Sequence, residues 1–262
     1  MDTERLDQGT ARTAAELRLQ LAQMTAASQL LERGAQDEKS RRYLAALNQS
    51  ICRMLRIVGR LEFTARLGEE DPPRLMRTHA DLAQLTAELG ERLAGLLAYS
   101  GVELVVDVPE RLPAWVDEGL VRQMLMELVS NGAKAGRHVA LSLTRQGDRA
   151  VFTVEDDGPG IPPERLDYLF SSAEEAVPDW RRGGVGVSIA RRVAELHGGA
   201  LVAGPGQGLK AAASIPLGEG EGAGLESPGL PWDRGGFDET VVALSDLLPA
   251  QAFGLEGDWR GG

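Results

Sequence analysis

The chain has 262 residues, of which 43% are hydrophobic and 26% charged, a composition typical of a globular protein with about one to two domains. Its formal charge of -11 argues against nucleic-acid binding, and no apolar run reaches the roughly 18 residues of a membrane span. Cys52 is the single cysteine, which excludes an internal disulfide and favours a cytoplasmic location.

Residues 1–70 predict a helical hairpin, because apolar residues recur three and four positions apart in two runs. These residues are Leu17, Leu21, Met24 and Leu31 in the first run and Leu44, Leu47, Ile51, Met54, Val58, Leu61 and Ala65 in the second. Gly34 and Asp37 mark the turn between the two helices. Because two long helices cannot cover their own apolar faces in water, we expect a homodimer in which two hairpins form a four-helix bundle. The alternative is a monomeric hairpin that packs on the rest of its chain.

A second domain is predicted from residue 77 to residue 217, after an acidic, proline-containing break at residues 68–73. Its helical and strand patterns alternate along the chain. The predicted helices are 82–97, 117–135 and 188–196, and the predicted strands are 102–108, 139–144, 150–155, one near 201 and 211–215. This order predicts an α+β fold class, with the hairpin followed by a two-layer α/β sandwich whose helices cover one face of a single sheet.

Residues 218–262 are rich in glycine, glutamate and proline, which predicts a flexible acidic tail. Within this tail, the stretch from Thr240 to Leu248, together with Phe253, is apolar enough to dock on a protein surface. Composition does not separate docking on the chain's own core from docking on a partner.

Three short motifs follow one another in the second domain, and the first comprises residues 127–134 on a predicted helix. Asn131 offers one hard oxygen, and Mg²⁺ typically takes one or two protein ligands beside its waters and phosphate oxygens. Lys134 lies one turn later on the same face, where its ammonium group can meet phosphate. The alternative is that Asn131 is only a capping or surface residue.

The second motif, residues 156–161, follows a predicted strand. The Asp156 carboxylate can accept a hydrogen bond from the adenine amino group, whereas guanine would present its own acceptor there. We therefore expect ATP to bind more tightly than GTP. Gly158 and Gly160 permit a nucleotide to approach the backbone closely, although this motif by itself is most often a plain turn.

The third motif, residues 184–189, opens a predicted helix with Gly184 and Gly186. The free amides and the dipole of such a helix start suit phosphate groups, but a glycine pair alone is weak evidence. Between the second and third motifs, residues 162–183 are polar with Phe170 as an aromatic anchor, a composition that suits a lid over a site.

In this order, the motifs resemble the catalytic and ATP-binding domain of histidine kinases, in the superfamily shared with gyrase and the mismatch-repair ATPases. Residues 127–134 are similar to the asparagine box of that family, 156–161 to its first glycine box and 184–189 to its second. Phe170 is similar to the lid phenylalanine, and His197 to Gly199 with Gly208 match the turn and strand start that follow. The resemblance implies that ATP and Mg²⁺ are the cofactors and that Asn131 is the metal ligand. The nucleotide-binding residues that it implies are Asn131, Lys134, Asp156, Gly158, Gly160, Ile161, Phe170, Gly184, Val185, Gly186 and Val187.

Residues 1–70 are similar to the dimerisation and phosphotransfer hairpin of the same family, but they differ at the reactive position. Ala15 stands where the resemblance places the phosphoaccepting histidine. Leu19 stands where the family has a residue that it uses in dephosphorylating a response regulator, and Gln20 stands where the family has a proline. Glu16 keeps the place of the acid–base residue next to the histidine. The three histidines of the chain, His79, His138 and His197, all lie in the second domain.

Four functions are compatible with this sequence. The first is a homodimeric, ATP-binding, histidine-kinase-like protein of two-component signalling that does not phosphorylate itself and has a response regulator or another signalling protein as partner. The second is an ATPase in which Glu127 activates water, as the resemblance to gyrase-type relatives implies. The third is a kinase acting in trans on a histidine or serine of another chain. The fourth is a histidine kinase in which Ala15 is an engineered substitution.

Overall fold

The computed structural model describes residues 2–32, 34, 37–67, 74–160, 185–218 and 237–253. The chain divides into two compact units, one formed by Met1–Arg74 with Pro231–Gly262 and the other by Leu75–Leu230. We call the first the helical unit and the second the sheet unit. The helical unit is therefore assembled from both ends of the chain.

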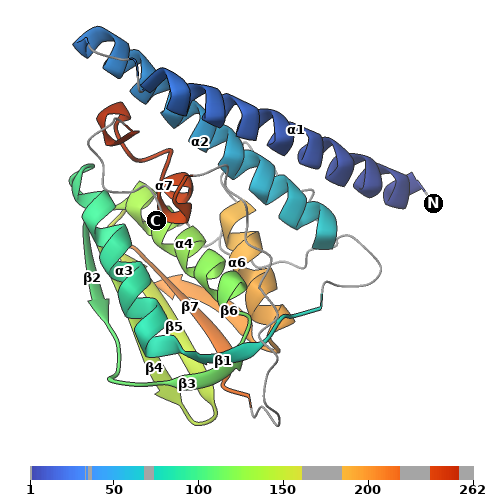
Figure 1. Ribbon diagram of the computed structural model, residues 1–262. Coiled ribbons are helices and arrows are strands. Elements are labelled where there is room, and N and C mark those ends of the chain that lie inside the picture. The colour runs from blue at the N-terminus through green and yellow to red at the C-terminus, as the bar shows by residue number, and fades with distance from the viewer. Residues whose placement is uncertain are drawn as a thin grey trace. The chain divides into compact units, whose positions relative to one another are not determined.

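Two long helices, α1 (Asp2–Glu32) and α2 (Glu38–Leu67), lie side by side in the helical unit (Figure 1). Asp37 caps the second helix, because its carboxylate accepts hydrogen bonds from the Ser40 amide at 2.9 Å and the Ser40 hydroxyl at 2.6 Å. Nε of Arg18 donates to Oε1 of Glu62 over 3.0 Å and links the two helices. The start of the second helix is thus fixed locally by the side chain of Asp37.

Ten of the eleven apolar residues of the predicted seam divide into two groups, and the eleventh, Leu44, is half-buried. Leu21, Ile51, Val58 and Ala65 are buried within this single chain. Six others are between 36% and 61% exposed, and they form one row seven residues apart on each helix. The rows are Leu17, Met24 and Leu31 on α1 and Leu47, Met54 and Leu61 on α2. One copy of the chain therefore leaves a heptad-spaced apolar row exposed on each helix.

A third element of the helical unit comes from the C-terminal end of the chain. The short helices α7 (Glu239–Ala243) and η2 (Ala250–Phe253) both contact α2. Asp238 caps α7 by accepting a hydrogen bond from the Thr240 amide at 2.8 Å. The sequence placed this segment in a tail and left its docking surface open, and the structure seats it on the chain's own second helix.

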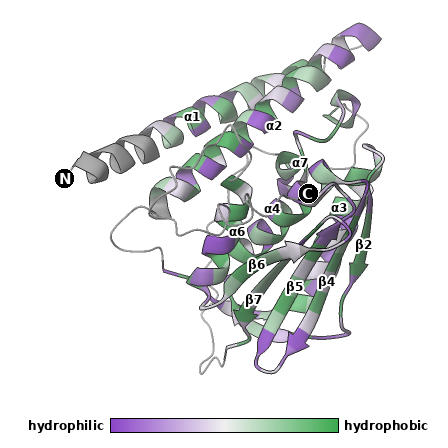
Figure 2. Ribbon diagram, turned by 180° about the vertical axis from the view of Figure 1, so that it is seen from behind, coloured by the Kyte–Doolittle hydropathy of each residue, from purple (hydrophilic) through white to green (hydrophobic). Residues whose placement is uncertain are grey.

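The sheet unit contains a five-stranded mixed sheet in the order β2-β4-β5-β7-β6. Its strands are β2 (Glu103–Asp107), β4 (His138–Gln146), β5 (Arg149–Asp156), β7 (Leu209–Pro216) and β6 (Ala200–Pro205). Only β2 and β4 are parallel among these neighbours. Alternate residues of β5 are buried, which places one face of the sheet against the core. The strands accordingly carry both hydrophobic and hydrophilic residues (Figure 2).

Three helices cover one face of this sheet, as Figure 1 shows. They are α3 (Leu82–Ala98), α4 (Glu118–Ala135) and α6 (Val185–Leu196). The α+β class predicted from the sequence is confirmed, and α6 begins three residues before the helix that the sequence predicted at 188–196. Within the parts of the chain described here, no helix is both long and apolar enough to cross a membrane.

A small antiparallel sheet of β1 (Thr78–Asp81) and β3 (Pro113–Val116) was not predicted from the sequence. The rings of His79 and Trp115 pack edge to face across it, with their centroids 4.6 Å apart. Asp81 ties this sheet to the main helical layer, because its Oδ1 accepts hydrogen bonds from the amides of Ala83 at the start of α3 and of Leu112, both at 3.0 Å.

Candidate nucleotide-binding site

The structure brings the first two sequence motifs together at the end of β5. Gly132 on α4 lies so close to the sheet that an added Cβ would be 3.3 Å from Cγ1 of Val139 and 3.6 Å from Cβ of Asp156. The helix that carries Glu127, Asn131 and Lys134 therefore runs directly beside the strand that ends at Asp156.

Asp156 is 5% exposed, and its two carboxylate oxygens have different surroundings. Oδ1 accepts hydrogen bonds from the Gly158 amide at 2.9 Å and the Leu209 amide at 3.3 Å. No donor from the described residues contacts Oδ2. The backbone thus fixes the carboxylate through one oxygen and leaves the other as an acceptor for a ligand.

Three glycines shape the loop that follows Asp156. An added Cβ at Gly158 would lie 2.6 Å from the Ala135 carbonyl oxygen at the end of α4. Gly160 has a φ of +71°, a backbone conformation that favours glycine. A Cβ at Gly208 would lie 2.6 Å from the Gly158 amide nitrogen. The loop is therefore held between the end of α4 and the turn before β7, without room for a side chain at Gly158 or Gly208.

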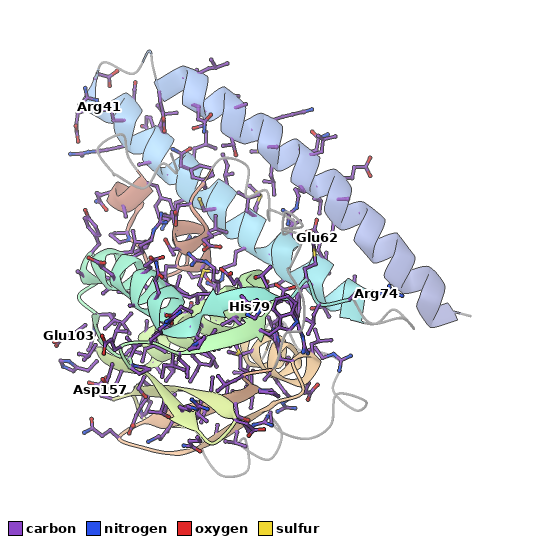
Figure 3. The ribbon with its side chains drawn as sticks, turned by 60° about the horizontal axis from the view of Figure 1, so that its bottom comes forward. Arg41, Glu62, Arg74, His79, Glu103 and Asp157 are labelled. Atoms are coloured by element: carbon purple, nitrogen blue, oxygen red, sulfur yellow. The ribbon has the colours of Figure 1, made fainter. Side chains whose placement is uncertain are left out.

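Asp157 anchors the other side of this loop, a role that the sequence did not indicate. Its Oδ1 accepts hydrogen bonds from the amides of Arg137 at 2.7 Å and His138 at 2.9 Å. The His138 amide bond is the main cause that holds the pKa of Asp157 below its usual value. Gly136 is equally necessary, because its Cβ would collide with Asp157. In Figure 3, Asp157 and Glu103 lie at the same end of the sheet, where Glu103 contacts Nδ1 of His138 at 3.0 Å.

The polar residues of α4 form a row along one side of the helix, since Gln123, Glu127 and Asn131 are four residues apart. Glu127 is buried, and Lys134 is exposed. Among the described residues, Nδ2 of Asn131 and Oε1 of Gln123 are buried without a hydrogen-bond partner. An unpaired buried amide costs about 1 to 3 kcal/mol, so the Nδ2 group of Asn131 is suited to a hydrogen-bond acceptor from outside the described residues. The single hard oxygen of the same side chain fits Mg²⁺.

The third motif is described only in part. Val185, Gly186 and Val187 form the first turn of α6, which packs along α4, and Gly186 is buried. Ile161, Phe170 and Gly184 lie outside the described residues, as does the predicted lid at 162–183.

His197 connects the two helices that carry the motifs. Its Nδ1 donates to the Val193 carbonyl oxygen at 2.8 Å at the end of α6, and its Nε2 accepts from the Asp117 amide at 3.1 Å. Asp117 is in turn the N-cap of α4, because its carboxylate accepts from the Leu120 amide at 3.1 Å. These two bonds assign His197 as the neutral Nδ1-protonated tautomer. Burial is the largest cause that lowers the pKa of His197 below 6.5.

This buried histidine predicts a stability that falls on acidification. In the unfolded chain His197 binds a proton below about pH 6.5, whereas in the folded chain its lowered pKa delays protonation. The stability that it contributes is therefore complete above pH 6.5 and is lost as the pH falls through the folded pKa. We expect the melting temperature of the full chain to fall between pH 6.5 and pH 5 and His197→Gln to flatten this dependence.

Ala15 and Glu16 lie on α1 in the helical unit, where both are exposed. Arg18, one turn further along α1, faces α2 through its bond to Glu62. The structure therefore places these two candidate residues and the motifs of α4 and β5 on different units of the chain.

Comparison with known proteins agrees with this geometry. Residues 116–219 match the family described as histidine kinase-, DNA gyrase B-, and HSP90-like ATPase. The adaptive-response sensory kinase SasA of Parasynechococcus marenigrum is 36% identical over 152 residues, which are 54% of this chain and 40% of that protein. SasA of Crocosphaera subtropica is 30% identical over 217 residues, 77% of this chain and 57% of that protein.

Solved structures give the same result. Full-length ShkA, solved in complex with AMPPNP, has a TM-score of 0.67 at 26% identity, covering 82% of this chain and 47% of ShkA. The histidine kinase AdeS of Acinetobacter baumannii shares the fold with a TM-score of 0.53 at 17% identity, covering 77% of this chain and 96% of the other. This chain spans about half the length of the SasA proteins that it matches. Residues 116–219 therefore form a histidine-kinase-type ATPase domain, and over a larger part of its length the chain is similar to sensor histidine kinases.

Proposed function

We propose that this protein binds ATP with Mg²⁺ and acts as a dimeric, histidine-kinase-like component of two-component signalling that does not phosphorylate itself. The observation that carries the nucleotide assignment is Asp156, a buried carboxylate held by the backbone through one oxygen with the other open to a donor. An adenine amino group is such a donor. ShkA, the related protein described above, was solved with AMPPNP, an analogue of ATP.

The other residues of the motifs complete this assignment. The Asn131 amide would hold Mg²⁺, which shields the phosphate charge, and Lys134 would contact phosphate oxygens. Glycine loops and the start of α6 would approach the nucleotide closely. The remaining residues that we assign to nucleotide binding are Gly158, Gly160, Ile161, Phe170, Gly184, Val185, Gly186 and Val187.

The proposed loss of self-phosphorylation comes from Ala15, since a methyl group cannot act as a nucleophile. This residue is exposed on α1, and Glu16 beside it is exposed as well. With no nucleophile to activate, Glu16 would act only as a surface residue. The protein would then signal by binding a response regulator or another signalling protein.

Incubation with γ-labelled ATP and Mg²⁺ tests this proposal. We expect no acid-labile phosphohistidine on the unmodified chain and some labelling of Ala15→His, because the substitution restores a nucleophile on an exposed helix face. Ala26→His, at another exposed position of α1, is the matched control and should stay unlabelled. Labelling of His79, His138 or His197 in the unmodified chain would refute the proposal. Label on a second protein in an added lysate would instead indicate a kinase acting in trans, and the native gene sequence decides whether Ala15 is engineered.

A second function, ATP hydrolysis, is favoured by the position of Glu127. This carboxylate is buried on α4 one turn before Asn131, where it could activate a water molecule. Release of free phosphate from the unmodified chain, abolished in Glu127→Gln with ATP binding retained, would support the ATPase.

The proposed dimer is supported by the exposed heptad rows of α1 and α2, because an isolated hairpin leaves them in water. We expect light scattering to give twice the chain mass at micromolar concentration. Met24→Glu should shift the protein toward monomer, since it places a charge within the α1 row. Gln29→Glu, on a different side of the same helix, should remain dimeric. A monomeric unmodified chain would contradict the bundle.

A further inference from the structure

The C-terminal segment 237–253, which we call the clasp, is well buried although it lies beyond the ATPase domain in the sequence. Six of its apolar side chains are at most 5% exposed. They are Val241, Val242, Leu244, Leu248, Ala252 and Phe253. The clasp belongs to the same compact unit as α1 and α2. It therefore packs as part of the helical unit.

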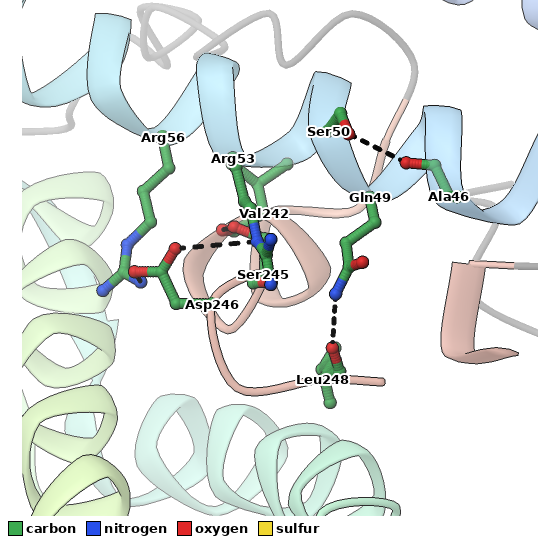
Figure 4. A network of polar contacts seen from close by, with 9 residues as sticks. All are labelled: Ala46, Gln49, Ser50, Arg53, Arg56, Val242, Ser245, Asp246 and Leu248. Carbon is green, nitrogen blue, oxygen red and sulfur yellow. Dashed lines mark hydrogen bonds and ion pairs between the residues drawn. The ribbon is translucent and has the colours of Figure 1, made fainter. Parts of the chain in front are cut away.

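A row of side-chain donors on α2 binds the backbone of the clasp. Nε2 of Gln49 donates to the Leu248 carbonyl oxygen at 2.7 Å, and Nε of Arg53 donates to the Ser245 carbonyl oxygen at 3.2 Å. Figure 4 shows both side chains reaching from α2 toward the clasp. The two carbonyls lie beyond the end of α7, outside the hydrogen-bond pattern of that helix. Side chains of α2 thus supply the hydrogen-bond donors for these two carbonyls.

Arg56 adds a charge to this recognition. Its Nη1 lies 2.6 Å from Oδ2 of Asp246 in the clasp (Figure 4). The Arg56 side chain is only 5% exposed, whereas that of Asp246 is 41% exposed. A buried cation is strongly disfavoured when its anionic partner is removed. This pair therefore favours a carboxylate at the position of Asp246 in the segment that docks on α2.

Asn48 connects the clasp to the other helix of the hairpin. Its Nδ2 donates to the Phe253 carbonyl oxygen at 3.2 Å and to Oε1 of Glu32 on α1 at 2.7 Å. Its Oδ1 accepts from the Ser28 hydroxyl at 2.6 Å. Asn48, Ser28 and Glu32 are all buried. The seat of the clasp is therefore built from both long helices.

We propose that this face of α2 is a peptide-docking site whose occupant is residues 237–253 of the same chain, held as a detachable clasp. The face recognises a short helical peptide with apolar side chains, free carbonyls after its helix ends and one carboxylate. Because residues 75–230 lie between α2 and the clasp, a seated clasp joins the ATPase domain to the helical unit at both of its chain ends. When the clasp is detached, the ATPase domain is joined to the helical unit only at its N-terminal end. Docking itself requires no nucleotide.

The experiment cuts the folded full chain at a protease site inserted between residues 226 and 227. We expect the C-terminal fragment to remain bound at micromolar concentration and to be displaced by excess synthetic peptide of residues 237–253. Asp246→Ala should weaken fragment binding about tenfold or more, since it removes a charge-assisted bond to a buried cation. Arg42→Ala is the matched control, because Arg42 is exposed and pairs with Glu38 on its own helix, and it should change binding less than about twofold.

Gln49→Ala gives a second variant should Asp246→Ala fail to fold, and it should also weaken binding. Immediate loss of the fragment from the unmodified chain, or equal binding in Asp246→Ala and Arg42→Ala, would overturn the proposal. Amide hydrogen exchange of residues 240–248 in the uncut chain should be equally slow in the unmodified protein and in Met24→Glu, the variant expected to be monomeric. Faster exchange in Met24→Glu would assign the clasp to a second copy and overturn the assignment to the same chain. None of these measurements depends on ATP binding, so the docking site and the proposed function can fail separately.

Discussion

Asp156→Asn should weaken ATP binding by about ten- to a hundredfold while leaving the loop at residues 157–160 in place. The asparagine oxygen can still accept the hydrogen bonds of the Gly158 and Leu209 amides. Its amide group then occupies the place of Oδ2 and faces the adenine amino group donor to donor. Loss of a hydrogen bond to a charged acceptor costs about 1.5 to 3 kcal/mol, which sets the size of the effect. Calorimetric titration in the presence of Mg²⁺ measures it.

GTP provides the internal comparison, because guanine has a carbonyl oxygen where adenine has its amino group. The new donor suits that oxygen, so the preference for ATP over GTP should collapse in Asp156→Asn. Asp157→Asn is the matched control, since an asparagine oxygen there can retain the bonds to the amides of Arg137 and His138. Equal binding of ATP and GTP by the unmodified chain, or unchanged ATP binding in Asp156→Asn, would contradict the role of Asp156.

Gly208→Ala should destabilise the ATPase domain by about 1 to 3 kcal/mol and impair nucleotide binding. The added Cβ would collide with Oδ1 of Asp156 and would lie 2.6 Å from the Gly158 amide nitrogen and 2.7 Å from the Asp156 carbonyl oxygen. Two of these three atoms are backbone, so relief requires the loop to move and Asp156 to lose its hydrogen bonds. Faster amide hydrogen exchange in β5 and β7 would report the loss within the sheet unit alone.

Gly204→Ala is the control for this substitution, because Gly204 lies in β6 and an added Cβ there meets nothing within 4 Å. It should leave exchange in β5 unchanged or slightly slower, since alanine reduces the entropy of the unfolded chain. Equal exchange in the two variants would show that the close approach at Gly208 is not limiting.

The ATPase domain was readily predicted where local sequence decides the structure. Leucines at helical spacing predicted α3, and Asp117 marked the start of α4, where it is now seen as the N-cap. Alternating apolar residues predicted β4 and β5. The short strands β1 and β3 escaped prediction because four residues each show no clear period, and their pairing depends on partners far apart in the sequence.

Candidate site residues were recognised when their chemistry was local and missed when it was not. Asp156 and Gly158 lie in one motif, whereas Gly136 matters only because Asp157 returns to the end of α4 in three dimensions. The docking face of α2 was hidden for a different reason. Its Asn48, Gln49, Arg53 and Arg56 have the composition of an ordinary solvent-facing helix surface, and only the folded chain shows what they bind.

The clasp also sets the order in which the protein can be completed during synthesis. Asn48 and its partner Phe253 are 205 residues apart, and Arg56 precedes Asp246 by 190 residues. At a translation rate of about 5 to 20 residues per second, the ribosome releases α2 roughly 10 to 40 seconds before the segment that covers its donor row. The ATPase domain, made in between, can fold first. A nascent chain that stops before the clasp would therefore display an unfinished helical unit, and chaperones and proteases could distinguish it from the full-length protein.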